Sequence, residues 1–168
     1  MPRSFEVSFS SPATVEQIHG AFADEAYWLA RLASMQGGTR TLQSLTVDPD
    51  RRVRVVAVED LRHGAMPGML AKVYRGDLNV VTTETWTPAA DGRVEGTVTV
   101  AVTGAPGSGH GSGTLAPSGA GSRLSMAATV QFDVPLVGGR VENFLCRQLA
   151  DGLGHIQQFT TSWVGEHG

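Results

Sequence analysis

His155 is the first side chain of this sequence that we consider for proton transfer. It directly precedes Ile156, at the edge of an apolar stripe in a C-terminal segment of helical period, and Asp151 lies one turn earlier. A histidine inside a pocket titrates near neutral pH and can act as acid or base. The alternative, which we favour, is a half-buried structural histidine or one that pairs with Asp151.

Glu84 is the second candidate, because it shares a strand face with Trp86 in the segment TTETWTP. Side chains two residues apart on a strand point the same way, so an inward Trp86 places Glu84 inward as well. A carboxylate on a concave sheet face needs a partner, for which we consider Arg75 or Arg147. The pattern fits equally well with a bulge that leaves Glu84 in solvent.

Glycines alternate through the segment GAPGSGHGSG, residues 104–113. No lysine follows them as a phosphate loop requires, and strands are expected on both sides, so we exclude a nucleotide phosphate site. Side chains two residues apart point to the same face of a strand, so four of these glycines are expected on the inward face and His110 on the outer face. These glycines are Gly107, Gly109, Gly111 and Gly113. They either allow the C-terminal helix to pack closely against the sheet, which we favour, or shape the wall of a cavity.

Metal, cofactor and nucleophile chemistry find no support in the sequence. The five histidines lack the spacing of a metal motif, and Cys146 is the only cysteine. The serine at position 112 stands between glycines but lacks the strand-to-helix setting of a hydrolase nucleophile. We therefore expect no metal or cofactor, and we expect Cys146 to be a small buried filler.

Composition places the chain among single-domain globular proteins. Its 168 residues carry 17% charged side chains and a net charge of −3, and we expect one domain over 1–168. Without a basic stripe, nucleic acid is not an expected partner. No apolar run approaches the roughly 18 residues of a membrane helix. The single cysteine and the absence of a signal-like start favour a cytoplasmic location.

Periodicity predicts the elements that must position these residues. Strands are expected over 4–10, 40–48, 51–60, 78–88, 92–104 and 122–135, with another in the glycine segment. Thr14 with Gln17 forms a weak capping box before a first helix, and Asp24 can cap a second. After Pro135 a helix of about 24 residues follows, with a stripe that includes Val141, Leu149 and Trp163. Consecutive strands between helical blocks indicate an antiparallel α+β fold.

The beginning SFEVSFSSPATVEQIHGAFADEAYW and the end VQFDVPLVGGRVENFL resemble the helix-grip superfamily. This superfamily includes START lipid-transfer domains and polyketide cyclases, and the sequence is most similar to an actinobacterial-type family of unknown function within it. The resemblance covers essentially the whole chain. It implies a seven-stranded antiparallel curved sheet wrapped around the long C-terminal helix, with two short helices after the first strand and a pocket between sheet and helix.

We therefore expect a small hydrophobic or amphipathic ligand, such as a lipid or polyketide, in that pocket. The expected lining, besides the four glycines, is Met69, Trp86, Phe132, Val134, Phe144 and Phe159. Glu84 and His155 would be its polar groups. Two alternatives stay open: a cyclase- or aromatase-like enzyme that uses Glu84 or His155 as acid and base, and a protein-interaction module, for example a homodimer. The sequence favours binding over catalysis.

Overall fold

The computed structural model describes residues 2–35, 38–61, 68, 72 and 76–167. Its strands are β1 (Arg3–Ser11), β2 (Thr39–Val47), β3 (Val53–Leu61), β4 (Leu78–Pro88), β5 (Val94–Thr103), β6 (Gly107–Ser118) and β7 (Gly121–Phe132). Its helices are α1 (Val15–Phe22), α2 (Glu25–Ser34) and α4 (Gly138–His167). The predicted α+β fold class is confirmed, and β4 has the bounds expected for it from the sequence.

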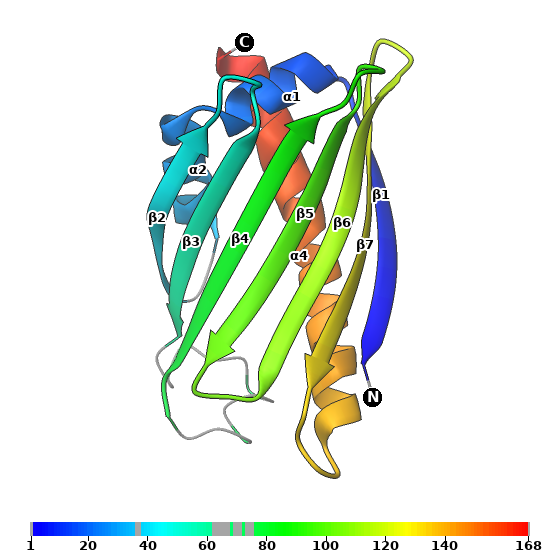
Figure 1. Ribbon diagram of the computed structural model, residues 1–168. Coiled ribbons are helices and arrows are strands. Elements are labelled where there is room, and N and C mark those ends of the chain that lie inside the picture. The colour runs from blue at the N-terminus through cyan, green and yellow to red at the C-terminus, as the bar shows by residue number, and fades with distance from the viewer. Residues whose placement is uncertain (1, 36–37, 62–67, 69–71, 73–75, 168) are drawn as a thin grey trace.

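The strands form one antiparallel sheet of seven, in the order β1-β7-β6-β5-β4-β3-β2. Strands β2 to β7 lie next to one another in sequence order, whereas β1 pairs with β7 at one edge of the sheet. Figure 1 shows the sheet curving in front of α4, with α1 and α2 gathered at one end. The contacts of α4 with the sheet are mainly with β1 and β7, whereas α2 packs on β2 at the opposite edge.

Local signals explain where the helices begin. Thr14 caps α1 in a complete capping box with Gln17, and the Asp24 carboxylate accepts a hydrogen bond from the backbone of α2. The start of α4 needs a glycine, since a Cβ at Gly138 would lie 2.7 Å from the carbonyl oxygen of Phe132. With 30 residues, α4 is longer than the sequence indicated.

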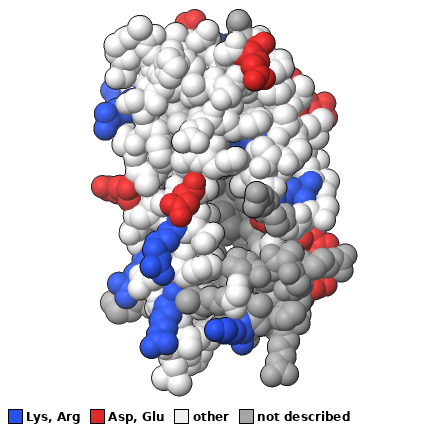
Figure 2. All heavy atoms as spheres, turned by 180° about the vertical axis from the view of Figure 1, so that it is seen from behind, with Lys and Arg blue, Asp and Glu red and all other residues white. Residues whose placement is uncertain are grey.

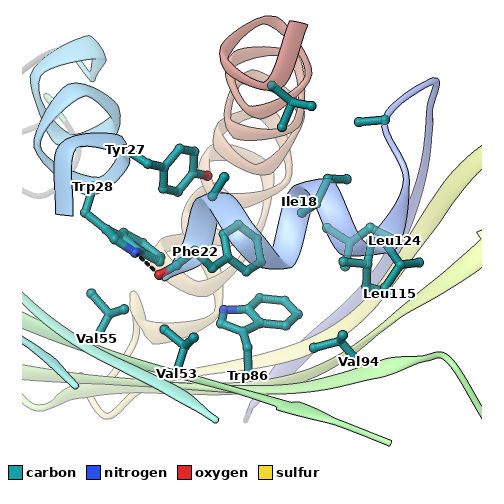
Figure 3. Packing of buried hydrophobic residues seen from close by; sticks show 14 of the residues in the cluster. Ile18, Phe22, Tyr27, Trp28, Val53, Val55, Trp86, Val94, Leu115 and Leu124 are labelled. Atoms are coloured by element: carbon teal, nitrogen blue, oxygen red, sulfur yellow. Dashed lines mark hydrogen bonds between the residues drawn. The ribbon is translucent and has the colours of Figure 1, made fainter. Parts of the chain in front are cut away.

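The main core fills the end of the fold where α1 and α2 cover the sheet. Trp86 of β4 lies against Phe22 of α1, with ring centroids 5.0 Å apart, and Tyr27 and Trp28 close the space above them (Figure 3). The indole nitrogen of Trp28 donates a hydrogen bond of 2.7 Å to the carbonyl of Phe22. This buried hydrogen bond adds direction to the apolar packing, which favours one arrangement of α1 and α2.

A second, smaller core lies toward the other end of the sheet. Its buried members are Leu78, Phe132 and Val141, from β4, β7 and the start of α4. Among the described residues, the two clusters are separate, because their buried members do not join into one network. Between them the concave face of the sheet carries small or short side chains.

No helix in the parts of the chain that the structure describes has both the length and the apolar character needed to span a membrane.

Candidate functional site

The concave face between the two cores is incompletely covered. Five inward positions on the middle strands define what we call the central strip, and all are half-buried: Thr82, Val100, Gly109, Gly111 and Ala128. Register places them side by side, with Thr82 opposite Val100, Val100 opposite Gly109, and Gly111 opposite Ala128. Since α4 packs mainly on β7 and β1, Ala128 of β7 is the one strip position on a strand that α4 contacts extensively, and the positions on β4, β5 and β6 lie beyond it. The face seen in Figure 2 is hollowed near its middle.

The glycines of β6 lie on the inner face as predicted, and His110 is exposed on the outer face. The structure does not bear out α4 packing as their reason. The atoms nearest to a Cβ at each position come from β5 or β7 and not from α4. A Cβ at Gly107 would lie 2.5 Å from the Phe132 ring, and one at Gly113 would lie 3.0 Å from Met126. At Gly109 the nearest atom is 3.5 Å away, an ordinary contact.

Glu84 points inward, and its partner is Arg31 of α2. The two side chains form an ion pair of 2.9 Å, in which both residues are less than one tenth exposed. The other carboxylate oxygen of Glu84 accepts a hydrogen bond of 3.2 Å from the Trp86 indole nitrogen. Of the expected partners, Arg147 is exposed on α4 and Arg75 lies outside the described residues. Arg31 was missed, although its spacing from Tyr27 and Trp28 places it on their helix face.

A chain of hydrogen bonds continues from this ion pair to α4. The Arg31 guanidinium contacts the hydroxyl of Tyr27, which lies 2.7 Å from the hydroxyl oxygen of Thr160. Thr160 donates its own proton to the carbonyl of Ile156, so it accepts the proton of Tyr27. Burial raises the pKa of Tyr27, which keeps it a donor. Burial alone would lower the pKa of Arg31, but the charge of Glu84 and the contacts with Tyr27 together outweigh burial, so the pKa is raised.

The buried face of α4 is more polar than its apolar stripe indicated. Glu142, Gln157 and Thr160 are buried, whereas Leu149 of the expected stripe is 42% exposed. One carboxylate oxygen of Glu142 accepts a hydrogen bond of 2.9 Å from the backbone of Phe132, which joins the start of α4 to the end of β7. The carboxamide nitrogen of Gln157 is buried without a hydrogen-bond partner among the described residues.

His155 does not lie inside the fold, so the expectation that it supplies a polar group of the interior is wrong. Its side chain is exposed, and its Nε2 lies 3.3 Å from the hydroxyl of Ser34 at the end of α2. Ser34 donates to the carbonyl of Arg31, so its oxygen is free to accept a proton from His155. His155 therefore connects α4 to α2 at the surface.

The predicted lining residues fall into three groups. Trp86 and Phe132 are buried within the first and the second core, so they close the ends of the strip. Val134, Phe144 and Phe159 are half-buried, and Phe159 packs on Tyr27 with ring centroids 5.9 Å apart. Met69 lies outside the described residues.

Two grooves of about 480 Å³ each lie away from the central strip. One is on the outer face over β1, β6 and β7 and includes Gly113 in its lining. The other lies between α2 and β2, where Leu29 and Met35 border it. Neither includes a strip residue.

Cys146 is half-buried on α4, with its sulfur 3.8 Å from the carbonyl oxygen of Arg3. Burial raises the pKa of this thiol, and the nearby Glu142 raises it further. Because the thiolate is the reactive form, this environment is that of an inert cysteine. Within the described ranges, no three His, Cys, Asp or Glu side chains come together as metal ligands.

Solved structures share this fold at low sequence identity. A di-domain ARO/CYC, StfQ, from the steffimycin biosynthetic pathway aligns with a TM-score of 0.62 at 12% identity, over 99% of this chain and 52% of StfQ. A protein of Thermus thermophilus aligns with a TM-score of 0.60 at 15% identity, over 96% of this chain and 97% of that one. A START superfamily protein of Mycobacterium smegmatis aligns with a TM-score of 0.55 at 11% identity, over 98% of this chain and 99% of that one. The predicted helix-grip resemblance is confirmed.

Relatives at higher identity are uncharacterised proteins of Mycobacterium tuberculosis strain H37Rv and Mycobacterium bovis. Each is 34% identical over 170 residues, which covers 98% of this chain and 98% of the relative. The family described as protein of unknown function DUF2505 matches residues 6–164. The chain therefore belongs to the DUF2505 family and has a START-type, helix-grip fold.

Proposed function

We propose that this protein binds a small hydrophobic or amphipathic molecule between the concave face of the sheet and α4. The observation that carries the proposal is the central strip, whose inward side chains stay half-buried while the cores on both sides of it are closed. Ligand sites in proteins are concave and mostly apolar, with a few polar groups that orient the guest. The strip and its polar border fit that description.

The polar border is formed by Arg31, Glu84, Tyr27 and Thr160, which bridge β4, α2 and α4. Because Arg31 and Glu84 neutralise each other, the border is polar but carries no net charge. Apolar surface beside such a border suits an amphipathic guest better than a purely aliphatic one.

Binding without turnover is the function that we favour over acid–base catalysis. Each carboxylate oxygen of Glu84 already accepts a hydrogen bond, and its charge is paired with Arg31. Proton transfer from Glu84 would first require this buried pair to open, which is costly. His155 is at the surface, so the two residues do not supply an acid and a base to one interior site.

Two adjacent alanines provide a matched test. Ala128 is half-buried on the strip, and Ala127 is exposed on the outer face of the same strand. We expect Nile red, an uncharged apolar dye, to bind the wild-type protein with enhanced fluorescence. Ala128→Phe fills part of the space and should weaken the affinity at least about tenfold, equivalent to about 1.4 kcal/mol. Ala127→Phe should bind as the wild type does.

Thermal unfolding of both variants verifies that each is folded before binding is compared. A wild-type protein that does not bind the dye would contradict the proposal. So would folded Ala128→Phe and Ala127→Phe variants with the same affinity, because binding would then take place outside the strip.

A further inference from the structure

Gln157 carries a buried hydrogen-bond donor that the described part of the chain leaves unused. The residue is 7% exposed, and its carboxamide nitrogen has no partner there. Buried amide groups are nearly always hydrogen-bonded, because an unmatched one loses its interactions with water and gains nothing in return. The unmatched group therefore calls for a partner that the described residues do not provide.

The spacing along α4 turns Gln157 toward the sheet. Thr160 and Val164, three and seven residues further on, are both buried, and Leu153, one turn earlier, packs against the first core. Gly154, on the β1 side of this face, lies next to Phe9, at 3.7 Å from a Cβ built there. Gln157 thus lies between the helix positions that contact Tyr27 and those that contact β1.

The polar groups of the border on α2, β4 and α4 are already matched. The hydroxyl protons of Tyr27 and Thr160 are both donated, as the hydrogen-bond chain shows. Arg31 is paired with Glu84, and a second inward pair joins Arg40 to Glu59 at 2.6 Å. Each pair joins one cation to one carboxylate, so these two pairs hold no net charge that would attract an ionised ligand.

We propose that Gln157 is a polar anchor of the site, where its carboxamide donates a hydrogen bond to an oxygen of an uncharged amphipathic ligand. The ligand class is thereby narrowed to neutral molecules with a carbonyl, ether or hydroxyl oxygen on an apolar body. This inference rests on the proposed function and adds the residue that orients the guest.

The test combines a ligand change with a side-chain change. The ketone-bearing dye Prodan is an uncharged naphthalene, and 2-dimethylamino-6-propylnaphthalene has the same body without the oxygen. Binding of both compounds to the wild type, Gln157→Leu and Gln158→Leu is measured by isothermal titration calorimetry. Gln158 is the matched control, because it is the next residue on α4 and is exposed.

We expect Gln157→Leu to bind Prodan about fivefold more weakly, the typical net effect of one hydrogen bond. The compound without the ketone should bind Gln157→Leu as tightly as the wild type, or more tightly. Gln158→Leu should leave both affinities unchanged. The unfolding temperature of Gln157→Leu should not fall, since the substitution removes an unmatched polar group from the interior.

An equal loss of affinity for both compounds in Gln157→Leu would overturn the inference, because Gln157 would then shape the space without donating to the ketone. An unchanged affinity for Prodan would overturn it as well. Tighter binding of a carboxylate analogue of Prodan than of Prodan itself would contradict the neutral ligand class. If neither compound bound the wild type, the proposed function would fail first, and the inference would fall with it.

Discussion

At the scale of single residues, the pair of Arg31 and Glu84 determines the electrostatic character of the interior. Both side chains are buried, and they join α2 to β4 across residues that are 53 positions apart in sequence. A buried ion pair gives little net stability compared with apolar packing, but a lone buried charge is strongly unfavourable. The pair is therefore best tested by removing one partner and then both.

Glu84→Gln should lower the free energy of unfolding by about 3–5 kcal/mol, because it leaves the Arg31 charge without compensation. In the double variant Arg31→Met with Glu84→Gln, the loss should be clearly smaller than the sum of the two single losses. Urea unfolding followed by tryptophan fluorescence measures all four proteins. Additive losses would mean that the two residues are not energetically coupled.

His19 provides a second residue-scale prediction, concerning pH. It is 3% exposed on α1, and its Nε2 is buried without a partner among the described residues. Burial is the main cause that lowers its pKa below the ordinary value of 6.5, and the charge of Arg51 adds to it, although a backbone hydrogen bond at Arg51 opposes the shift. The unfolded chain therefore binds more protons than the folded protein as the pH falls below 6.5.

We expect the free energy of unfolding to be fully maintained above pH 6.5 and to decrease below it, by at most about 1.4 kcal/mol per pH unit from this group. His19→Gln should remove that part of the pH dependence in a series of urea titrations between pH 7 and pH 5. His110→Gln, at an exposed site of β6, should retain it. If both variants kept the wild-type slope, another group would be responsible.

At the scale of elements, β6 is a strand whose glycines serve different purposes. Gly107 makes room for the ring of Phe132, and on the neighbouring β5 Gly96 makes room for the ring of Trp86 in the same way. At Gly109 the nearest described atoms are at ordinary contact distance. The glycine pattern of β6 therefore combines one position that the packing of Phe132 requires, Gly107, with one that leaves space on the strip, Gly109.

Gly107→Ala should destabilise the protein by about 1–3 kcal/mol, because its methyl group would collide with Phe132. Gly109→Ala, two positions along the same strand, should be neutral or stabilising by up to about 1 kcal/mol, since alanine is less flexible than glycine in the unfolded chain. Differential scanning calorimetry compares the two. Similar destabilisation by both would show that the strip at Gly109 is as tightly filled as the core at Gly107.

The elements themselves were largely predictable, whereas the site was predictable only in part. Strict alternation identified the strands and turned the β6 glycines inward, because a half-buried strand has one dry and one wet face. For Glu84 it left an inward and a solvent-facing orientation equally open. The apolar stripe predicted for α4 included Leu149, which is exposed. The helix instead turns the polar residues Glu142, Gln157 and Thr160 to the interior, and apolar periodicity gives no sign of that. Arg31 escaped notice because periodicity does not show which arginine packs against an inward Glu84, and Arg75 and Arg147 were considered instead.

At the scale of the whole molecule, the helices among the described residues lie over the two edges of the sheet, and the central strip between them is half-buried. The long helix α4 lies along β1 and β7, and α2 lies on β2. The cores at the two ends supply the packing, so the space between them need not be filled for the fold to be stable. Under the proposed function, this division separates stability from ligand binding, which is why Ala128→Phe should alter binding while the protein remains folded.

Native mass spectrometry of the freshly purified protein tests the central claim most directly. We predict a species heavier than the bare chain by the mass of a small molecule, which is lost on extraction with organic solvent. That species should be depleted in Ala128→Phe but kept in Ala127→Phe, and the extracted compound should be uncharged and carry at least one oxygen. A guest retained equally by both variants would contradict the account, as would a wild-type protein found only as the bare chain that takes up neither Nile red nor Prodan.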